Sequence, residues 1–199
     1  LGDDGRYHGV LTIDQSLVPQ GGSLYIYAKN LNSANPFGDL RIITPGYAED
    51  TEQVFTNQFL AAMEPYSTLR FMEWNITNNS LQTSWDARAT MDDFSWSRGA
   101  GMPYETIVDL ANDLHKDVWI NVPALATTDY VENLAEFFHE NLDPSLKLYV
   151  EYSNETWNGT FKAKSQIYAA AQNNPLVTYK SDKEKAVAQQ TAYMIKEIG

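Results

Sequence analysis

Cysteine is absent from this chain of 199 residues, and basic residues are scarce. Without cysteine the chain can form no disulfide, no thiolate metal site and no cysteine nucleophile. Only 14 Lys and Arg residues stand against 26 Asp and Glu residues, which gives a formal net charge of −12 at pH 7. This charge argues against binding to nucleic acid or to an anionic membrane surface, because both are negatively charged themselves. Neutral sugars remain compatible partners.

Long apolar runs are missing as well. No run approaches the ~20 residues that a membrane-spanning helix needs, and no basic-then-apolar signal peptide opens the chain.

No glycine-rich phosphate turn follows the first expected strand, which argues against a doubly wound nucleotide-binding domain. Asp3, Asp4 and His8 lie in a glycine-rich terminus, where such side chains are usually solvated rather than bound to metal. We therefore predict no metal and no cofactor.

Hydrophobic residues make up 43% of the chain and aromatic residues 13%, enough for one sizeable globular core. Residues 1–38 are rich in Gly, Asn and Asp, contain strand-like runs at 10–14 and 23–29, and are predicted to form an N-terminal β-rich appendage. From residue 39 to residue 199 strands alternate with helices, which is the pattern of a parallel sheet with crossover helices. The expected strands are residues 40–44, 69–74, 118–122 and 148–153, and the expected helices are residues 52–66, 104–116, 129–141 (capped by Thr127 or Thr128), 162–172 and 181–198.

The stretch 146–158 carries the chemistry around which the chain is organised. Apolar and polar side chains alternate along its first half, so a strand here has one apolar face and one face that can line a polar interior. Asn154 and Glu155 follow at the end of that strand, with Glu151 four residues before Glu155 and Trp157 two residues after it. Glu155 could be one more exposed acid in an acidic protein. Two carboxylates and an aromatic ring in one short stretch instead suit sugar chemistry.

Residues 149–155, Tyr-Val-Glu-Tyr-Ser-Asn-Glu, resemble the strand-four signature of retaining glycoside hydrolases with a (β/α)8 barrel, in which an Asn-Glu pair carries the general acid/base. Together with residues 69–74 and 117–123, the run 151–158 also resembles a narrower group of secreted bacterial proteins described as cellulose-binding or glycosidase-like. The resemblance covers roughly residues 39–199. It implies an α/β fold that supplies the first half, about four β/α units, of a (β/α)8 barrel.

The resemblance also implies roles for individual residues. Glu155 would be the general acid/base, and Asn154 would hold the 2-hydroxyl of the sugar. Arg70 would support the catalytic carboxylates, and Glu151 is expected to pair with Arg70 because a charge inside a barrel should be paired. A retaining enzyme needs a second carboxylate as nucleophile, about 5–5.5 Å from the first. By the resemblance this nucleophile lies on the seventh strand of the barrel, beyond the residues of this chain.

The active site of a (β/α)8 barrel lies at the C-terminal ends of its strands, and the candidate substrate-binding residues fall there. They are Arg70, Trp74, Trp85, Trp96, Asn121 and Trp157. Trp85 and Trp96 belong to a long loop, residues 75–103, and either form a sugar platform or pack the loop down. Because such a barrel needs about 250 residues, we expect the chain to be a fragment. The remainder of the barrel or a partner chain would cover the edges of the sheet.

Four Asn-X-Ser/Thr sequons begin at Asn75, Asn78, Asn154 and Asn158, and they suggest a secreted glycoprotein, although asparagine-rich loops also produce sequons by chance. A glycan on Asn154 would be incompatible with catalysis. Two functions remain open. The chain is either part of an extracellular glycoside hydrolase that acts on a β-linked polysaccharide by a two-carboxylate mechanism, or part of an inactive, glycosylated carbohydrate-binding or structural protein. A glutamate at the end of a seventh strand would favour hydrolysis.

Overall fold

The structure is a computed structural model, and its contacts divide the chain into two units, Leu1–Glu52 and Gln53–Gly199. The described residues are 7–12, 14, 16, 29–30, 32, 34, 41–48, 51–93, 95–96 and 99–199. Most of the predicted N-terminal β-rich appendage, including all but the last residue of the run 23–29, lies outside these residues.

In the first unit, short side-chain bonds define local turns. Asp14 Oδ1 accepts hydrogen bonds from the backbone N and the Oγ of Ser16, at 2.9 and 2.6 Å. These bonds hold the pKa of the Asp14 carboxyl below its ordinary value. The strand predicted at residues 40–44 is wrong in its described part, because residues 41–44 form no strand and Ile42 is 64% exposed. A short apolar run adopts strand geometry only where it has a neighbour to pair and pack with.

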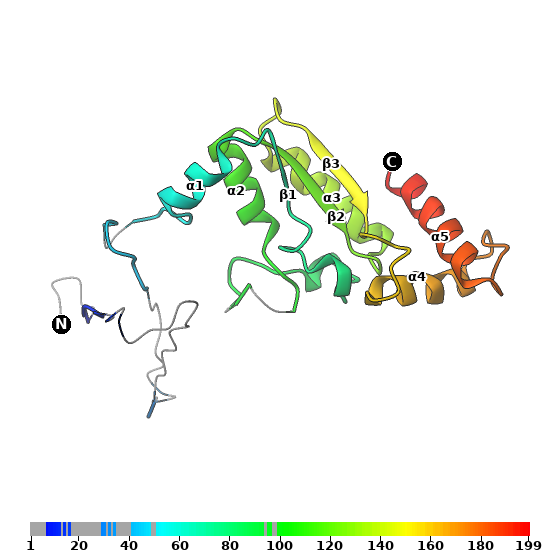
Figure 1. The fold of residues 1–199 in the computed structure, drawn as a ribbon, viewed down its shortest axis with the longest axis horizontal. Coiled ribbons are helices and arrows are strands. Elements are labelled where there is room, and N and C mark those ends of the chain that lie inside the picture. The colour runs from blue at the N-terminus through cyan, green and yellow to red at the C-terminus, as the bar shows by residue number, and fades with distance from the viewer. Residues whose placement is uncertain are drawn as a thin grey trace. The chain divides into compact units, whose positions relative to one another are not determined.

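The second unit is built on a three-stranded parallel sheet (Figure 1). Its strands are β1 (Thr68–Arg70), β2 (Asp117–Val122) and β3 (Leu148–Tyr152), and they lie in the order β1-β2-β3. The sheet and the helices between its strands confirm the predicted α/β class. β1 ends earlier than predicted because the chain turns after Phe71, whose carbonyl oxygen accepts a hydrogen bond from Asn75 N at 3.2 Å.

The helices follow the predicted order, with two short 3-10 helices in the loop after β1. They are α1 (Asn57–Met63), η2 (Thr77–Asn79), η3 (Trp85–Ala87), α2 (Tyr104–Leu114), α3 (Thr128–Asn141), α4 (Lys162–Asn173) and α5 (Lys183–Ile198). The expected cap of α3 is confirmed at Thr127, whose side chain accepts a hydrogen bond from Tyr130 N at 3.2 Å. Among the described helices, none is long and apolar enough to cross a membrane.

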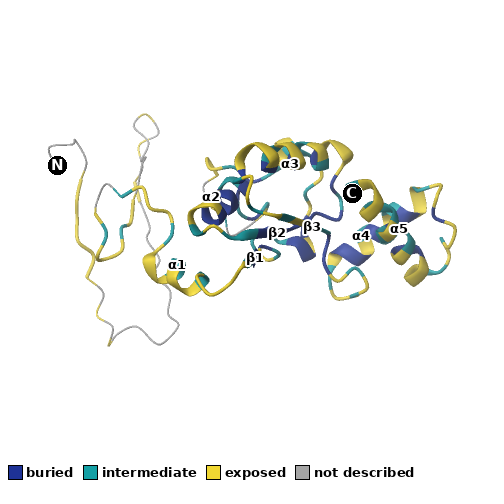
Figure 2. Cartoon of the chain, turned by 90° about the horizontal axis from the view of Figure 1, so that it is seen from above, coloured by how far each residue is buried: buried dark blue, intermediate teal, exposed yellow. Residues whose placement is uncertain are grey.

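Helices α2 and α3 cover one face of the sheet, with buried residues turned toward the strands (Figure 2). Val118 and Ile120 of β2 are fully buried there, together with Ile107 of α2. Successive side chains of a strand point to opposite faces, so Trp119 lies on the other face, where it is 38% exposed. That second face therefore remains partly open. Within the described residues, no further strand pairs with the outer edge of β1 or β3.

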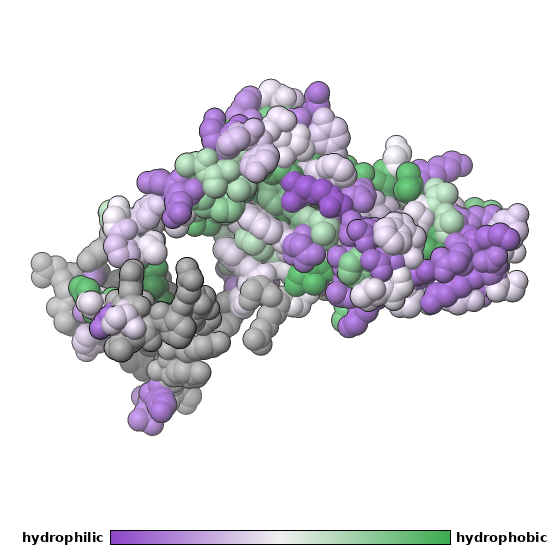
Figure 3. All heavy atoms as spheres, viewed as in Figure 1, coloured by the Kyte–Doolittle hydropathy of each residue, from purple (hydrophilic) through white to green (hydrophobic). Residues whose placement is uncertain are grey.

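The last two helices form a pair beside β3. α4 and α5 pack against each other, and α5 also contacts β3. A salt bridge between Lys164 Nζ of α4 and Glu184 Oε1 of α5, at 2.6 Å, joins the two helices. On the face seen in Figure 3, hydrophilic residues gather at the α5 end of the unit, where residues 183–185 are exposed.

A pair of buried tyrosines makes the fold sensitive to alkaline pH. The hydroxyl oxygens of Tyr104 (α2) and Tyr130 (α3) lie 2.9 Å apart. Burial raises the pKa of Tyr104 well above its ordinary value, and the neighbouring Tyr130 raises it further. Burial also raises the pKa of Tyr130. The folded chain therefore keeps both protons in a range where the unfolded chain releases them.

We expect the free energy of unfolding to fall as pH rises above about 10, by about 1.4 kcal/mol per pH unit for each tyrosine. The sign follows because the unfolded state binds fewer protons than the folded state in this range. Urea denaturation between about pH 8 and pH 11 measures the slope. The Tyr130→Phe variant should show a shallower slope than the parent chain. An equal slope in the two proteins would contradict the prediction.

Candidate functional site

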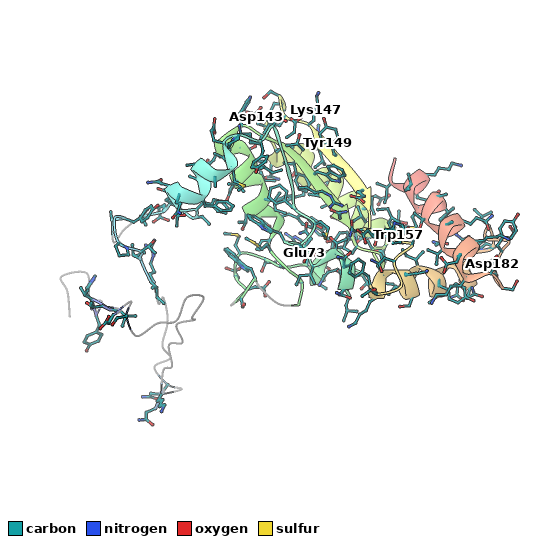
Figure 4. All side chains as sticks on the ribbon, viewed as in Figure 1. Glu73, Asp143, Lys147, Tyr149, Trp157 and Asp182 are labelled. Atoms are coloured by element: carbon teal, nitrogen blue, oxygen red, sulfur yellow. The ribbon has the colours of Figure 1, made fainter. Side chains whose placement is uncertain are left out.

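The three parallel strands bring their C-terminal ends to one edge of the sheet. Figure 4 shows Glu73, which follows β1, and Trp157, which follows β3, at this edge, while Asp143 and Lys147 lie at the opposite end. The sequence-predicted residues gather at the same edge. Trp74 comes four residues after β1, Asn121 is the penultimate residue of β2, and Glu155 comes three residues after β3. Parallel pairing thus assembles residues that are far apart in sequence.

Glu151 on β3 lies at the centre of a hydrogen-bond network that spans all three strands. Its Oε2 accepts bonds from Arg70 Nη2 at 2.8 Å, from Trp119 Nε1 at 3.0 Å and from Asn121 Nδ2 at 2.9 Å. Register explains the grouping, because Arg70 lies opposite Trp119 and Asn121 lies opposite Glu151. The Arg70 guanidinium also lies 4.9 Å from the centre of the Trp119 ring. The predicted pairing of Glu151 with Arg70 is confirmed.

Asn154 is fixed in place by the same arginine. Its Oδ1 accepts a hydrogen bond from Arg70 Nη2 at 2.9 Å, and its Nδ2 donates one to Asn78 Oδ1 at 2.8 Å. Asn154 is only 6% exposed. The Asn78 Nδ2 lies 3.7 Å from the sulfur of Met72, so the chain of contacts continues into the loop after β1. The side chain that precedes Glu155 is therefore held from both sides.

Glu155 itself faces solvent. Its Oε2 accepts a hydrogen bond from Asn158 Nδ2 at 2.9 Å. Ser153 and Glu155 both adopt left-handed backbone conformations, with φ of 55° and 41°. Such conformations cost about 1–2 kcal/mol for a residue other than glycine. These two residues flank Asn154, so the tight turn directs Asn154 inward and leaves Glu155 at the surface. Backbone strain of this kind clusters at functional sites.

The Trp74 ring packs in an aromatic cluster and is not an open surface for a ligand. Its ring is stacked with Phe55 and Phe59, with centroids 6.2 and 6.3 Å apart, and meets Phe71 edge-on at 5.0 Å. Phe55 and Phe59 come from α1 and the residues before it. Trp74 therefore fastens α1 to the C-terminal end of β1.

The other three candidate tryptophans differ in exposure. Trp85 is stacked on Tyr104 at 5.9 Å and carries the Arg88 guanidinium at 4.3 Å, so it packs the loop onto α2. Trp96 is half-buried, and its Nε1 has no hydrogen-bond partner among the described residues. Trp157 is 67% exposed at the edge that carries Glu155. Of the four candidates, Trp157 offers the most open ring face for a ligand.

Three of the four sequon asparagines are buried in the folded chain. Asn75, Asn78 and Asn154 are 4%, 8% and 6% exposed. N-linked glycans attach to Nδ2, and that atom of Asn154 points to Asn78. Asn158 is the only one of the four that is not buried. A glycan is therefore easiest to accommodate at Asn158.

Two contributors to the site were not assigned a role in it from the sequence. Trp119 donates a hydrogen bond to Glu151 and stacks with Arg70. The sequence could have indicated this role, because Trp119 lies two residues before Asn121 on β2 and so shares its face of the sheet. Asn78 holds Asn154 from the loop after β1. No sequence signal indicated this contact, because it depends on how a long loop folds back.

We expect Asn154→Ala to lower the free energy of unfolding by about 2 kcal/mol, because the change leaves the buried Asn78 Oδ1 without its donor. Asn158→Ala is the matched control, since it removes an asparagine from the same loop whose bond to Glu155 is exposed. Its cost should stay below about 0.5 kcal/mol. Urea denaturation of the two variants checks the difference. Equal costs would show that the Asn78 contact contributes nothing to stability.

Within the described residues, no three His, Asp or Glu side chains gather as a potential metal site. No family model, curated protein or solved structure matches this chain. The function is therefore inferred from the arrangement at the C-terminal edge of the sheet.

Proposed function

We propose that the second unit of this chain, with its three parallel strands, forms a segment of a (β/α)8 barrel in an extracellular glycoside hydrolase-like protein that acts on a β-linked polysaccharide. Glu155 acts as the general acid/base, and Asn154 orients the sugar. The nucleophile of the two-carboxylate mechanism comes from the seventh strand, in the remainder of the barrel. That remainder or a partner chain covers the outer edges of β1 and β3.

One observation carries the proposal. A network anchored on all three strands immobilises Asn154, while the adjacent Glu155 is presented to solvent at the shared C-terminal edge. Catalysis by proton transfer needs a carboxyl group that is both positioned and accessible to substrate. A purely structural glutamate would need no such fixed neighbour. The parallel order of the sheet and its helix-covered outer face are compatible with a barrel segment.

In this mechanism each residue has a distinct task. Glu155 gives its proton to the leaving oxygen of the glycosidic bond and later removes a proton from the attacking water. Asn154 is held by Arg70 and Asn78, so the residue that precedes Glu155 has a fixed position beside the sugar. Arg70 and Glu151 neutralise each other and keep this support rigid. Trp157 offers an open ring surface on which a sugar can stack.

The test is hydrolysis by the full-length protein that contains these residues. Incubation with a panel of β-linked glucans, mannans and xylans, followed by assay of new reducing ends, should identify a cleaved substrate. Proton NMR of the first product should show that the anomeric configuration is retained, because the proposed reaction has two displacements. Inversion of configuration, or no hydrolysis of any β-glycan, would contradict the proposal.

A second candidate is a carbohydrate-binding protein without catalytic activity. The observation that favours it is Trp157, whose ring is 67% exposed at this edge. Stacking on an exposed ring needs no acid/base. Binding to an insoluble polysaccharide that is lost in Trp157→Ala but unchanged in Glu155→Gln, without hydrolysis, would support this candidate over the first.

A further inference from the structure

A small cavity lies behind the loop that follows β1. Its lining includes Asn75, Gln82 and Arg88 of the loop and the buried tyrosines Tyr104 and Tyr130 at the beginnings of α2 and α3. Its volume is about 10 Å3. All of these residues belong to the second unit of the chain.

Three polar atoms of the side chains that line this cavity are buried and lack a hydrogen-bond partner among the described residues. They are Asn75 Oδ1, Gln82 Oε1 and Arg88 Nε. Asn75 is only 4% exposed. Buried polar atoms in native proteins are nearly always satisfied, by protein or by ordered water. Three side chains that line one cavity each carry such an unsatisfied atom, which indicates a bound partner.

The Arg88 guanidinium is held in place, so Arg88 cannot easily turn its Nε toward another acceptor. Its Nη2 donates to Glu105 Oε1 at 3.0 Å, and its guanidinium lies 4.3 Å from the centre of the Trp85 ring. The guanidinium is thus held by an ion pair and by a stacking contact. Its Nε–H remains directed to a buried position without an acceptor.

We propose that this cavity is a binding site for one ordered water molecule that bridges Asn75, Gln82 and Arg88. The site presents two acceptors and one donor, and a water molecule can donate two hydrogen bonds and accept one. An ammonium ion cannot accept from Arg88, and a halide ion cannot donate to the two amide oxygens. The volume admits about one water and excludes an organic ligand.

The bridging water would connect two parts of the loop that follows β1. It joins the start of the loop at Asn75 to its middle at Gln82 and Arg88. The same segment carries Asn78, which holds Asn154. The water would therefore help to fix the loop that supports the candidate site. This inference stands on the cavity alone and does not depend on glycoside hydrolysis.

A high-resolution crystal structure tests the occupant directly. The expected result is one density peak within hydrogen-bond distance of Asn75 Oδ1, Gln82 Oε1 and Arg88 Nε. A soak in bromide should give no anomalous signal in the cavity. A bromide peak there would overturn the proposal, because it would mean that both amides turn their NH2 groups inward and that the site binds an anion. A dry cavity would overturn it as well.

A double-mutant cycle tests the bridge in solution. Asn75→Leu and Gln82→Met should each lower the Tm by about 2–4 °C, and the double variant should lose less than the sum, because either change weakens the hold on the same water. Gln166→Met is the matched control, since Gln166 Oε1 is also buried without a partner but lies outside the cavity. It should be additive with Asn75→Leu. If the losses in Tm of Asn75→Leu and Gln82→Met add in the double variant, the proposed water bridge would be overturned.

Discussion

Gly101→Ala is expected to lower the free energy of unfolding by about 3 kcal/mol, a large loss for a single added methyl group. Gly101 has φ +85°, a conformation that costs about 1–2 kcal/mol for alanine. A Cβ at this position would also lie 2.4 Å from the carbonyl oxygen of Trp74 and 3.0 Å from Asn75 Cα. Both neighbours are backbone atoms, so the two ends of the loop after β1 would have to separate. The hydrogen bond from Met102 N to Trp74 O, at 2.8 Å, would be strained or lost.

A matched glycine separates the two causes. Gly99 also has a positive φ, of 68°, but a Cβ there would meet no atom of the described residues within 4 Å. Gly99→Ala should therefore cost only the conformational strain of about 1–2 kcal/mol. Gly159→Ala, with open space and no positive φ, should be nearly neutral. Urea denaturation of the three variants checks the order. If Gly101→Ala and Gly99→Ala lower the free energy of unfolding equally, the close approach of residue 101 to Trp74 does not add to the cost.

The sequence predicted best the elements that are buried and regular. β2 and α3 were each located to within one residue, because β2 is the central strand and α3 carries a threonine cap and a regular apolar stripe. The ion pair between Arg70 and Glu151 was also anticipated, through the resemblance and through the rule that charges inside a barrel are paired.

Other features depended on tertiary structure and could not be predicted. The apolar run at residues 40–44 looked like a strand, but pairing is a long-range property that local pattern does not encode. The left-handed turn at Ser153 and Glu155 breaks local backbone preferences, so no propensity would suggest it. The packing of Trp85 against Tyr104 was one of two open alternatives, and only the position of α2 distinguishes them.

Glu155→Gln in the full-length protein is expected to lower turnover of a β-glycan by a factor of about 10² or more, since general acid–base catalysis typically contributes that much. The amide keeps the size and shape of the carboxyl group but cannot donate a proton to the leaving oxygen. Glu73→Gln is the matched control, because Glu73 is an exposed glutamate at the same edge of the sheet (Figure 4). Its turnover should equal that of the parent. Equal losses in both variants would point to general electrostatics rather than to an acid/base.

The leaving group provides the sharper test of the role of Glu155. A nitrophenolate departs without a proton, so Glu155→Gln should still release the first equivalent of nitrophenol from an aryl β-glycoside at nearly the parental rate. The second step should then stall, because water needs a base to attack the glycosyl-enzyme. Azide attacks without a base, so adding it should restore turnover and yield a β-glycosyl azide. A variant that loses the first step as well, and is not rescued by azide, would remove the acid/base assignment and leave Glu155 a role in binding alone.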